Sequence, residues 1–203
     1  MLDYTLENQL HDEGFELVCG VDEAGRGPLC GPVFAAACIL PDGLVLEGLN
    51  DSKKLTPKKR DKLFDLICEN AIAYCIASAS VEEIDELNIL EADLLAMRRA
   101  IQGLAIKADF ALIDGNIARG FEIPARAVIG GDAKSPSIAA ASILAKVARD
   151  RDCITLDEQY PQYGIAKHKG YGTKQHMDAL RTYGPSPIHR KQFIRFLDKD
   201  ANK

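Results

Sequence analysis

The feature that most constrains the fold is a series of short apolar runs, several of them bounded by glycine or proline. Runs of this length and composition are typical of β-strands. They predict five strands, over residues 15–21, 33–40, 71–79, 110–113 and 125–129. Because helical patterns are interspersed among these runs, the sequence indicates an α/β protein with a central mixed sheet flanked by helices.

Three helices are indicated between and after the strands. Thr56-Pro57 provides an N-cap residue followed by proline at the first helical position, which predicts a helix over 58–70. Ser135-Pro136 repeats this device and predicts a long helix that ends near residue 159. Apolar residues at helical spacing predict a third helix over 88–107.

The C-terminal part of the chain has a different composition from the rest. A chain of 203 residues suits one compact domain with a real core. Its last part is richer in glycine, proline and tyrosine, which indicates a smaller helical segment joined by irregular loops. We therefore expect a core over residues 1–160 and a helical extension over 161–203, packed as one compact unit.

Charge and cysteine content restrict the class of protein. The net charge is -5, yet basic residues outnumber acidic ones between Lys134 and Arg195. This asymmetry points to a polyanion partner, and ordinary solvated charge stays open as the alternative. The six cysteines form no Cys-x-x-Cys pair, which disfavours zinc. With no secretory signal or membrane span visible, we expect a cytoplasmic protein with free thiols.

Four acidic residues occupy similar places, at or just beyond the ends of predicted strands. They are Asp22 and Glu23 in "GVDEAG", Asp114 in "LIDGN" and Asp132 in "GGDAKS". Ligands of open α/β sheets gather at such ends, and an all-oxygen set selects hard cations, Mg²⁺ or Mn²⁺. For Asp114 or Asp132 taken alone, an ordinary turn stays open as the alternative. Two adjacent acids before a glycine-rich loop are harder to explain as a turn.

The loop after the acids, "GRGPLCG", is similar to a dinucleotide-binding fingerprint with one residue too many. Pro28 and Pro32 prevent the helix whose N-terminus would face a pyrophosphate. Asp22 and Glu23 would repel a bare phosphate, unless divalent cations lie between them. The residues themselves therefore indicate a metal-dependent enzyme acting on a phosphate, with two metal ions flanking a phosphodiester.

Longer motifs resemble a known family. The stretches "GVDEAGRGPLCGPV", "DSKKLTPKKR", "LIDGN", "GGDAKSPSIAAASILAKVARDR", "HKGYGTKQH" and "GPSPIHRKQF" together resemble bacterial ribonuclease HII, of the type 2 ribonuclease H family. The matches follow the family order across residues 15–196. The resemblance implies a ribonuclease H-like catalytic core with a C-terminal helical extension that contributes to substrate binding. The related ribonuclease HIII is disfavoured because few residues precede the first predicted strand.

The resemblance also implies an activity and a set of site residues. The implied activity is endonucleolytic cleavage of RNA in RNA–DNA hybrids and incision 5′ of ribonucleotides embedded in duplex DNA, leaving 3′-hydroxyl and 5′-phosphate ends. The four metal-binding, catalytic acids fall on Asp22, Glu23, Asp114 and Asp132. The junction-reading residues fall on Gly25, Arg26 and Gly27, and the substrate-stacking tyrosine falls on Tyr171, for which packing onto the core stays open as the alternative.

Several lysines are candidates for contact with substrate phosphates. They are Lys53, Lys134, Lys146 and Lys169. In contrast, a solvated charge run is the preferred interpretation of residues 58–60, because cations oppose the dipole of a helix N-terminus. For His176 and His189 we expect a surface or packing position.

Two rival functions stay open from the sequence. One is a metal-dependent DNA nuclease or resolvase on the same fold, and the other is a non-catalytic hybrid-binding module. We expect a monomer that has no membrane partner. A sliding-clamp partner cannot be read from the sequence.

Overall fold

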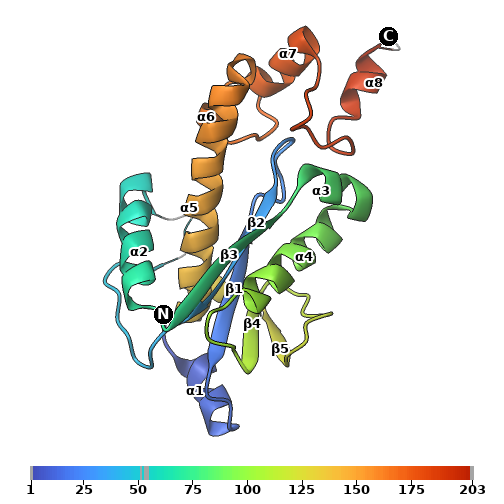
Figure 1. The fold of residues 1–203 in the computed structure, drawn as a ribbon. Helices are drawn as coiled ribbons and strands as arrows, with labels where there is room; N and C mark the ends of the chain where they lie inside the picture. Colours follow the sequence, from blue (N-terminus) through green and yellow to red (C-terminus); the bar gives the residue numbers. More distant parts are fainter. Residues whose placement is uncertain (1, 51, 53–54, 202–203) are drawn as a thin grey trace.

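A computed structural model of the chain describes residues 2–50, 52 and 55–201. Five strands form one mixed sheet in the order β3-β2-β1-β4-β5 (Figure 1). The strands are β1 (Val18–Ala24), β2 (Val33–Ile39), β3 (Ala73–Ala79), β4 (Phe110–Asp114) and β5 (Ala125–Val128). β2 pairs antiparallel with β1 and β3, whereas β4 runs parallel to β1 and β5. This arrangement confirms the predicted α/β fold with a mixed five-stranded sheet.

Helices cover both faces of the sheet, as Figure 1 shows. One face carries α2 (Pro57–Asn70) and the long α5 (Pro136–Gln159), whose alanines pack against apolar residues of β1 and β2. The other face carries α3 (Val81–Leu87) and α4 (Ile89–Gln102), packed over β1 to β4. Because both faces of the sheet are covered, side chains on both sides of β1, β2 and β4 are largely buried, and these strands contain continuous apolar runs in the sequence.

The start of α5 lies unusually close to β1, and Gly20 makes this possible. A Cβ atom placed on Gly20 would lie 2.1 Å from the backbone nitrogen of Ile138. No side chain fits there, so the sheet and helix approach backbone to backbone at this point. The Pro136 start of α5 was predicted, and Ser135 caps it by accepting a hydrogen bond from Ile138 N–H.

The helix α1 (Thr5–Asp12) was not predicted, and it contributes to the same helix start. Glu7 of α1 is buried and accepts hydrogen bonds from the Ser135 hydroxyl (2.6 Å) and from Ser137 N–H (3.3 Å). A carboxylate at a helix N-terminus is favoured by the helix dipole. This interaction therefore ties the N-terminal residues to α5.

Two predicted boundaries were wrong in an informative way. The first strand was predicted over 15–21 but spans Val18–Ala24, because pairing with β2 continues past the end of β4. Asp22 and Glu23 therefore lie on the strand and not beyond it. The helix predicted over 88–107 ends at Gln102, where Gly103 follows as C-cap.

The C-terminal segment consists of short helices joined by loops, as predicted. They are η3 (Pro161–Tyr163), α6 (Ile165–His168), α7 (Lys174–Tyr183) and α8 (Phe196–Ala201). Tyr163, Ile165 and Leu180 of this segment pack against Cys30 and Cys153, so the segment shares a hydrophobic cluster with α5 and the loop after β1. All six cysteines are free. In the described part of the chain, no helix is both long and apolar enough to cross a bilayer.

Candidate metal centre and nucleic-acid cleft

Three of the four predicted metal ligands meet at one edge of the sheet. Val21 of β1 lies opposite Ile113 of the parallel strand β4, so the next residues, Asp22 and Asp114, end side by side. Carboxylate oxygens of Asp22, Glu23 and Asp114 lie within 4.8 Å of one another. Parallel pairing of two strands distant in sequence is what brings these acids together.

The fourth acid, Asp132, lies next to this group without joining it. It is buried in the 3-10 helix η2 (Gly131–Ala133), which follows β5. Its neighbour Gly131 donates a backbone hydrogen bond of 2.7 Å to Oδ1 of Asp114. The structure thus connects the Asp132 turn to the acidic group but does not place the Asp132 carboxylate among the three clustered ones.

The electrostatics of the acidic group fit a divalent cation. Burial raises the pKa of Asp22 well above its usual range, and the nearby charges of Glu23 and Asp114 raise it further. Like charges at this distance disfavour one another, and a cation between them removes that cost. Because the ligands are all carboxylate oxygens, the site suits a hard ion and not zinc or copper.

A cleft of about 450 Å³ opens over Asp22 and Glu23. Its lining combines these two acids with the glycine loop, several cations and an aromatic ring: Asp22, Glu23, Ala24, Gly25, Arg26, Gly27, Ser52, Arg60, Lys146, Arg149 and Tyr171. Gly25 has φ of +103°, and a Cβ there would lie 2.3 Å from Nε of Arg149. Glycine is therefore required at this position by both backbone conformation and space.

Arg26 extends across the acidic side of the cleft. Its guanidinium lies 3.5 Å from Glu23 and 3.5 Å from Asp93 of α4. Burial and the charge of Glu23 raise the pKa of Asp93 to about 8, against the opposing effect of Arg26. Asp93 was missed in the sequence, although its position between Ile89 and Met97 on the apolar face of the helix was a usable signal.

Tyr171 lines the cleft next to the glycine loop. Its side chain is half exposed, and a Cβ on Gly27 would lie 3.4 Å from Cε1 of the Tyr171 ring. The ring therefore lies beside the loop and is not folded into the core. The geometry excludes the alternative in which this tyrosine is a core residue.

The predicted lysines differ in their distance from the cleft. Lys146 lines it and pairs with Asp150 at 2.6 Å. Lys169 lines an adjoining cleft of about 310 Å³, which also contains Lys146. Lys134 lines neither cleft, and its ammonium donates a hydrogen bond to the Ile129 carbonyl. Lys53 lies outside the described residues.

Arg60, interpreted from the sequence as part of a solvated charge run, instead lines both clefts. Its side chain is only 11% exposed, and it donates hydrogen bonds to the carbonyls of Ser52 and Leu55. Arg149 was also missed: it is buried beneath Gly25, with its Nε atom unpaired. Sequence reasoning could not find these roles, because both depend on which segments pack against α2 and α5.

Arg190 holds the glycine loop in place. It is fully buried, and its side chain donates hydrogen bonds of 2.7–3.3 Å to five backbone carbonyls: Gly25, Arg26, Pro28, Gly31 and Pro32. The five N–H groups of a guanidinium thus match five carbonyl acceptors. The motif "GPSPIHRKQF" contained this residue, but nothing local indicated its partners.

The sheet order, the flanking helices and the acids at the carboxyl ends of β1 and β4 define a ribonuclease H-like α/β protein. The profile of the family described as Ribonuclease HII matches residues 19–196. Since that match covers most of the chain, this protein belongs to the ribonuclease HII family, whose members are endoribonucleases acting on RNA–DNA hybrids. The family predicted from the sequence motifs is therefore confirmed.

Individual relatives agree with this assignment. The Ribonuclease HII of Burkholderia thailandensis is 58% identical over 178 residues, covering 88% of this chain and 83% of the relative. That of Caldicellulosiruptor bescii is 52% identical over 192 residues, covering 95% and 93%. Among solved structures, the ribonuclease H2 from Pyrococcus horikoshii OT3 is 30% identical with a TM-score of 0.76, covering 93% of this chain and 100% of that one.

Proposed function

We propose that the cleft over Asp22 incises nucleic acid 5′ of a ribonucleotide, both in RNA–DNA hybrids and in duplex DNA with a single embedded ribonucleotide. The observation that carries the proposal is the close approach of the Asp22, Glu23 and Asp114 carboxylates. Asp22 and Glu23 line a cleft that also contains Gly25 to Gly27 and Tyr171. A phosphodiester lying over the acids would then place its sugar beside the glycine loop.

Asp22, Glu23 and Asp114 would hold two divalent ions, Mg²⁺ or Mn²⁺, with Asp132 joining them once the ions are bound. Such ions supply an activated water and stabilise the leaving 3′-oxygen, which gives 3′-hydroxyl and 5′-phosphate ends. Asp22, the most deeply buried of the three clustered acids, anchors the group from β1. Gly131 N–H orients Asp114 by its hydrogen bond to Oδ1.

The glycine loop distinguishes ribose from deoxyribose. A 2′-hydroxyl both donates and accepts hydrogen bonds, so peptide groups at Gly25 and Gly27 and the guanidinium of Arg26 are suitable partners. The contacts of Arg26 with Glu23 and Asp93 hold this guanidinium near the acids. Tyr171 stacks on a sugar or base beside the 2′-hydroxyl.

The cations beside the acids bind the phosphate backbone. Lys146 and Arg60 line both clefts, and Lys169 extends the basic surface into the second one. Residues 161–203 thus contribute Lys169 and Tyr171 to substrate binding, while residues 1–160 supply the acids. Phosphate contacts of this kind make affinity fall as salt concentration rises.

The test compares three labelled substrates in Mg²⁺ and in Mn²⁺: a duplex with one ribonucleotide, its all-DNA twin, and an RNA–DNA hybrid. We expect cleavage of the first and third, with a 3′-hydroxyl end 5′ of the ribonucleotide. Exposed Lys107, at the opposite end of β4, provides a control variant, Lys107→Ala. Cleavage of the all-DNA twin at the same rate would indicate a DNA nuclease, and binding without cleavage would indicate a binding module.

A further inference from the structure

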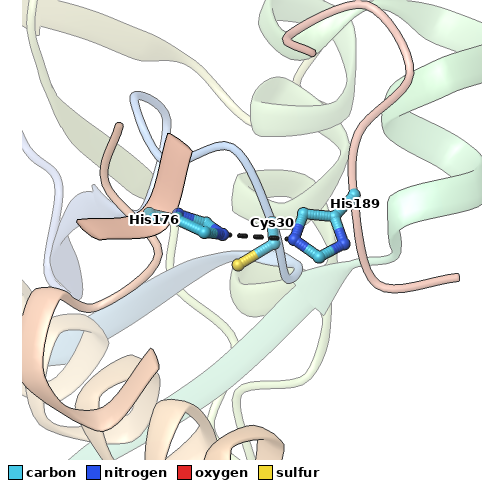
Figure 2. Close-up of side chains that lie close together, drawn as sticks. All are labelled: Cys30, His176 and His189. Carbon is cyan, nitrogen blue, oxygen red and sulfur yellow. Dashed lines mark hydrogen bonds between the residues drawn. The ribbon is translucent and has the colours of Figure 1, made fainter. Parts of the chain in front are cut away.

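A second polar cluster lies behind the glycine loop, away from the acids. His176 and His189 are buried, and their Nε2 atoms face each other at 3.1 Å (Figure 2). Cys30 lies beside them, with Sγ within 4.8 Å of a nitrogen of each ring. The sequence predicted a packing or surface position for both histidines, and burial agrees with the former.

The contacts of His189 assign its proton to Nε2. The backbone N–H of Ser186 donates to Nδ1 of His189 at 3.1 Å, so Nδ1 carries the lone pair. A neutral imidazole carries its single proton on the other nitrogen. His189 is therefore a donor through Nε2, toward His176.

The contacts of His176 assign the opposite tautomer. Its Nδ1 lies 3.1 Å from two carbonyl oxygens, those of Gly170 and Tyr171, which can only accept. Nδ1 therefore carries the proton, and Nε2 accepts the hydrogen bond from His189. Burial lowers the pKa of both rings, in His189 to about 4, so the pair is neutral near pH 7.

The same three residues have ligand types that zinc accepts. Zinc binds a thiolate and an unprotonated ring nitrogen, however, and burial raises the pKa of Cys30 to about 12. The Ser186 contact also leaves the facing nitrogen of His189 protonated. The contacts of the cluster thus favour a hydrogen bond between His176 and His189 over a metal ion bound by them. The metal content of the protein is therefore measured as part of the test.

His176 connects the histidine pair to the turn that contains Tyr171. Gly170, whose carbonyl accepts from His176, also accepts from Leu29 N–H at 2.8 Å, so this carbonyl joins the turn to the glycine loop. On the other side, His189 forms a bridge with Cys30 and is followed by Arg190, which holds the same loop. The histidine pair therefore connects the turn at Gly170 and Tyr171 with the glycine loop, and both of these segments line the cleft.

We propose that His176 and His189 are positioning residues, whose hydrogen bond holds the turn at Gly170 and Tyr171 so that the Tyr171 ring meets the ribonucleotide beside the glycine loop. This inference rests on the proposed function of Tyr171. Neither histidine touches substrate, and both act through the tyrosine.

The test uses two variants of His189 that differ by one methylene group. His189→Gln places an amide N–H near the position of Nε2 and keeps a donor toward His176. His189→Asn can accept from Ser186 as Nδ1 does but leaves no donor for His176. For cleavage of a duplex with one ribonucleotide, we expect His189→Asn to raise KM about tenfold, the equivalent of one hydrogen bond, with kcat nearly unchanged. His189→Gln should keep KM within about threefold of wild type.

A second step combines each change with Tyr171→Ala. If the pair acts through the tyrosine, His189→Asn should raise KM no further in the Tyr171→Ala background. An equal effect in both backgrounds would overturn the proposal, because it would indicate general packing. Equal KM values for the Asn and Gln variants would also overturn it. If Tyr171→Ala itself leaves KM unchanged, the proposed role of the tyrosine fails instead.

Metal analysis completes the test. The purified protein, with and without a chelator, is measured by mass spectrometry alongside Cys30→Ala and His189→Asn. We expect no zinc that depends on these residues. One zinc per chain that is lost in both variants would overturn the hydrogen-bonded pair in favour of a metal site.

Discussion

The molecule contains two polar clusters, and they differ in whether their groups have partners within the protein. At the carboxyl ends of β1 and β4, the carboxylates of Asp22, Glu23 and Asp114 approach one another, and burial together with the charges of Glu23 and Asp114 raises the pKa of Asp22. Behind the glycine loop, Arg190 meets five carbonyls, and the two histidines share one proton between facing nitrogens. One cluster needs a ligand, and the other is complete.

This difference separates residues that act on a substrate from residues that hold the site in shape. A cluster of like charges is costly in the folded protein, so its persistence indicates a cation that removes the cost. A cluster in which each donor meets an acceptor stabilises a single arrangement of the chain. The following experiments test the contrast, from the largest expected effect to the smallest.

Asp22→Asn should have opposite effects on activity and stability. Losing the central carboxylate should lower cleavage of an embedded ribonucleotide more than about 100-fold, as expected for the loss of a main electrostatic partner of the reaction. In a chelator near neutral pH, the variant should unfold at a higher denaturant concentration than wild type, because the raised pKa of Asp22 marks a repulsion that Asn removes. Near wild-type cleavage would refute the site assignment.

Arg190→Met should destabilise the protein strongly, in contrast to Asp22→Asn. The change leaves five carbonyls without their donors, and breaking a buried charged network of this kind costs about 3–5 kcal/mol. Urea unfolding of the variant and of Arg195→Ala, an exposed control, gives the measurement. A loss below about 1 kcal/mol would mean that the guanidinium does not hold the loop.

Divalent ions should stabilise the wild-type protein but stabilise Asp22→Asn much less. An ion that binds only the folded chain adds about 2.7 kcal/mol at a concentration 100 times its dissociation constant. Thermal unfolding across a Mg²⁺ or Mn²⁺ titration measures this gain. An equal gain in both proteins would place the binding site elsewhere.

The two clusters should respond to pH with opposite signs. Burial and His176 lower the pKa of His189 from 6.5 to about 4, so the unfolded chain binds more protons between these values and stability is lost as pH falls through them. Asp22 has a raised pKa, so in metal-free protein its contribution to the free energy of unfolding is lost as pH rises above 3.8.

Unfolding in urea at several pH values, in a chelator, can separate the two contributions. His189→Gln should reduce the loss of unfolding free energy as pH falls from 6.5 to about 4. Asp22→Asn should reduce the loss of unfolding free energy as pH rises above 3.8. Titratable side chains also pack around the histidines, namely His168, Tyr163 and Cys30. If the loss of stability at acid pH is unchanged in His189→Gln, titratable groups other than His189 cause it.

The smallest effects are expected among the lysines. Lys169→Ala should reduce the dependence of log affinity on log salt by about 0.9, the share of one phosphate contact in duplex DNA. Lys134→Ala should leave this slope unchanged, because its ammonium is bonded to the Ile129 carbonyl and lies outside both clefts. Equal slopes for the two variants would show that cleft position does not decide phosphate contact.

Much of the fold was predictable because its signals are local. Pro57 and Pro136 marked helix starts that the structure has, and the apolar runs marked five strands within a few residues. The helix α1 was missed because Glu7 is stabilised by Ser135 and Ser137, far away in the chain. The end of β1 was placed too early because β2, not the local sequence, extends it.

The sequence by itself determined that acids follow the apolar runs of β1 and β4, since an apolar run followed by acids is a local pattern. Only the tertiary structure decided that β1 pairs with β4, which makes neighbours of Asp22 and Asp114. It also decided that Arg190 reaches the glycine loop and that His176 meets His189. The physical reason is that long-range pairing depends on packing of the whole chain, and no short stretch encodes its partner.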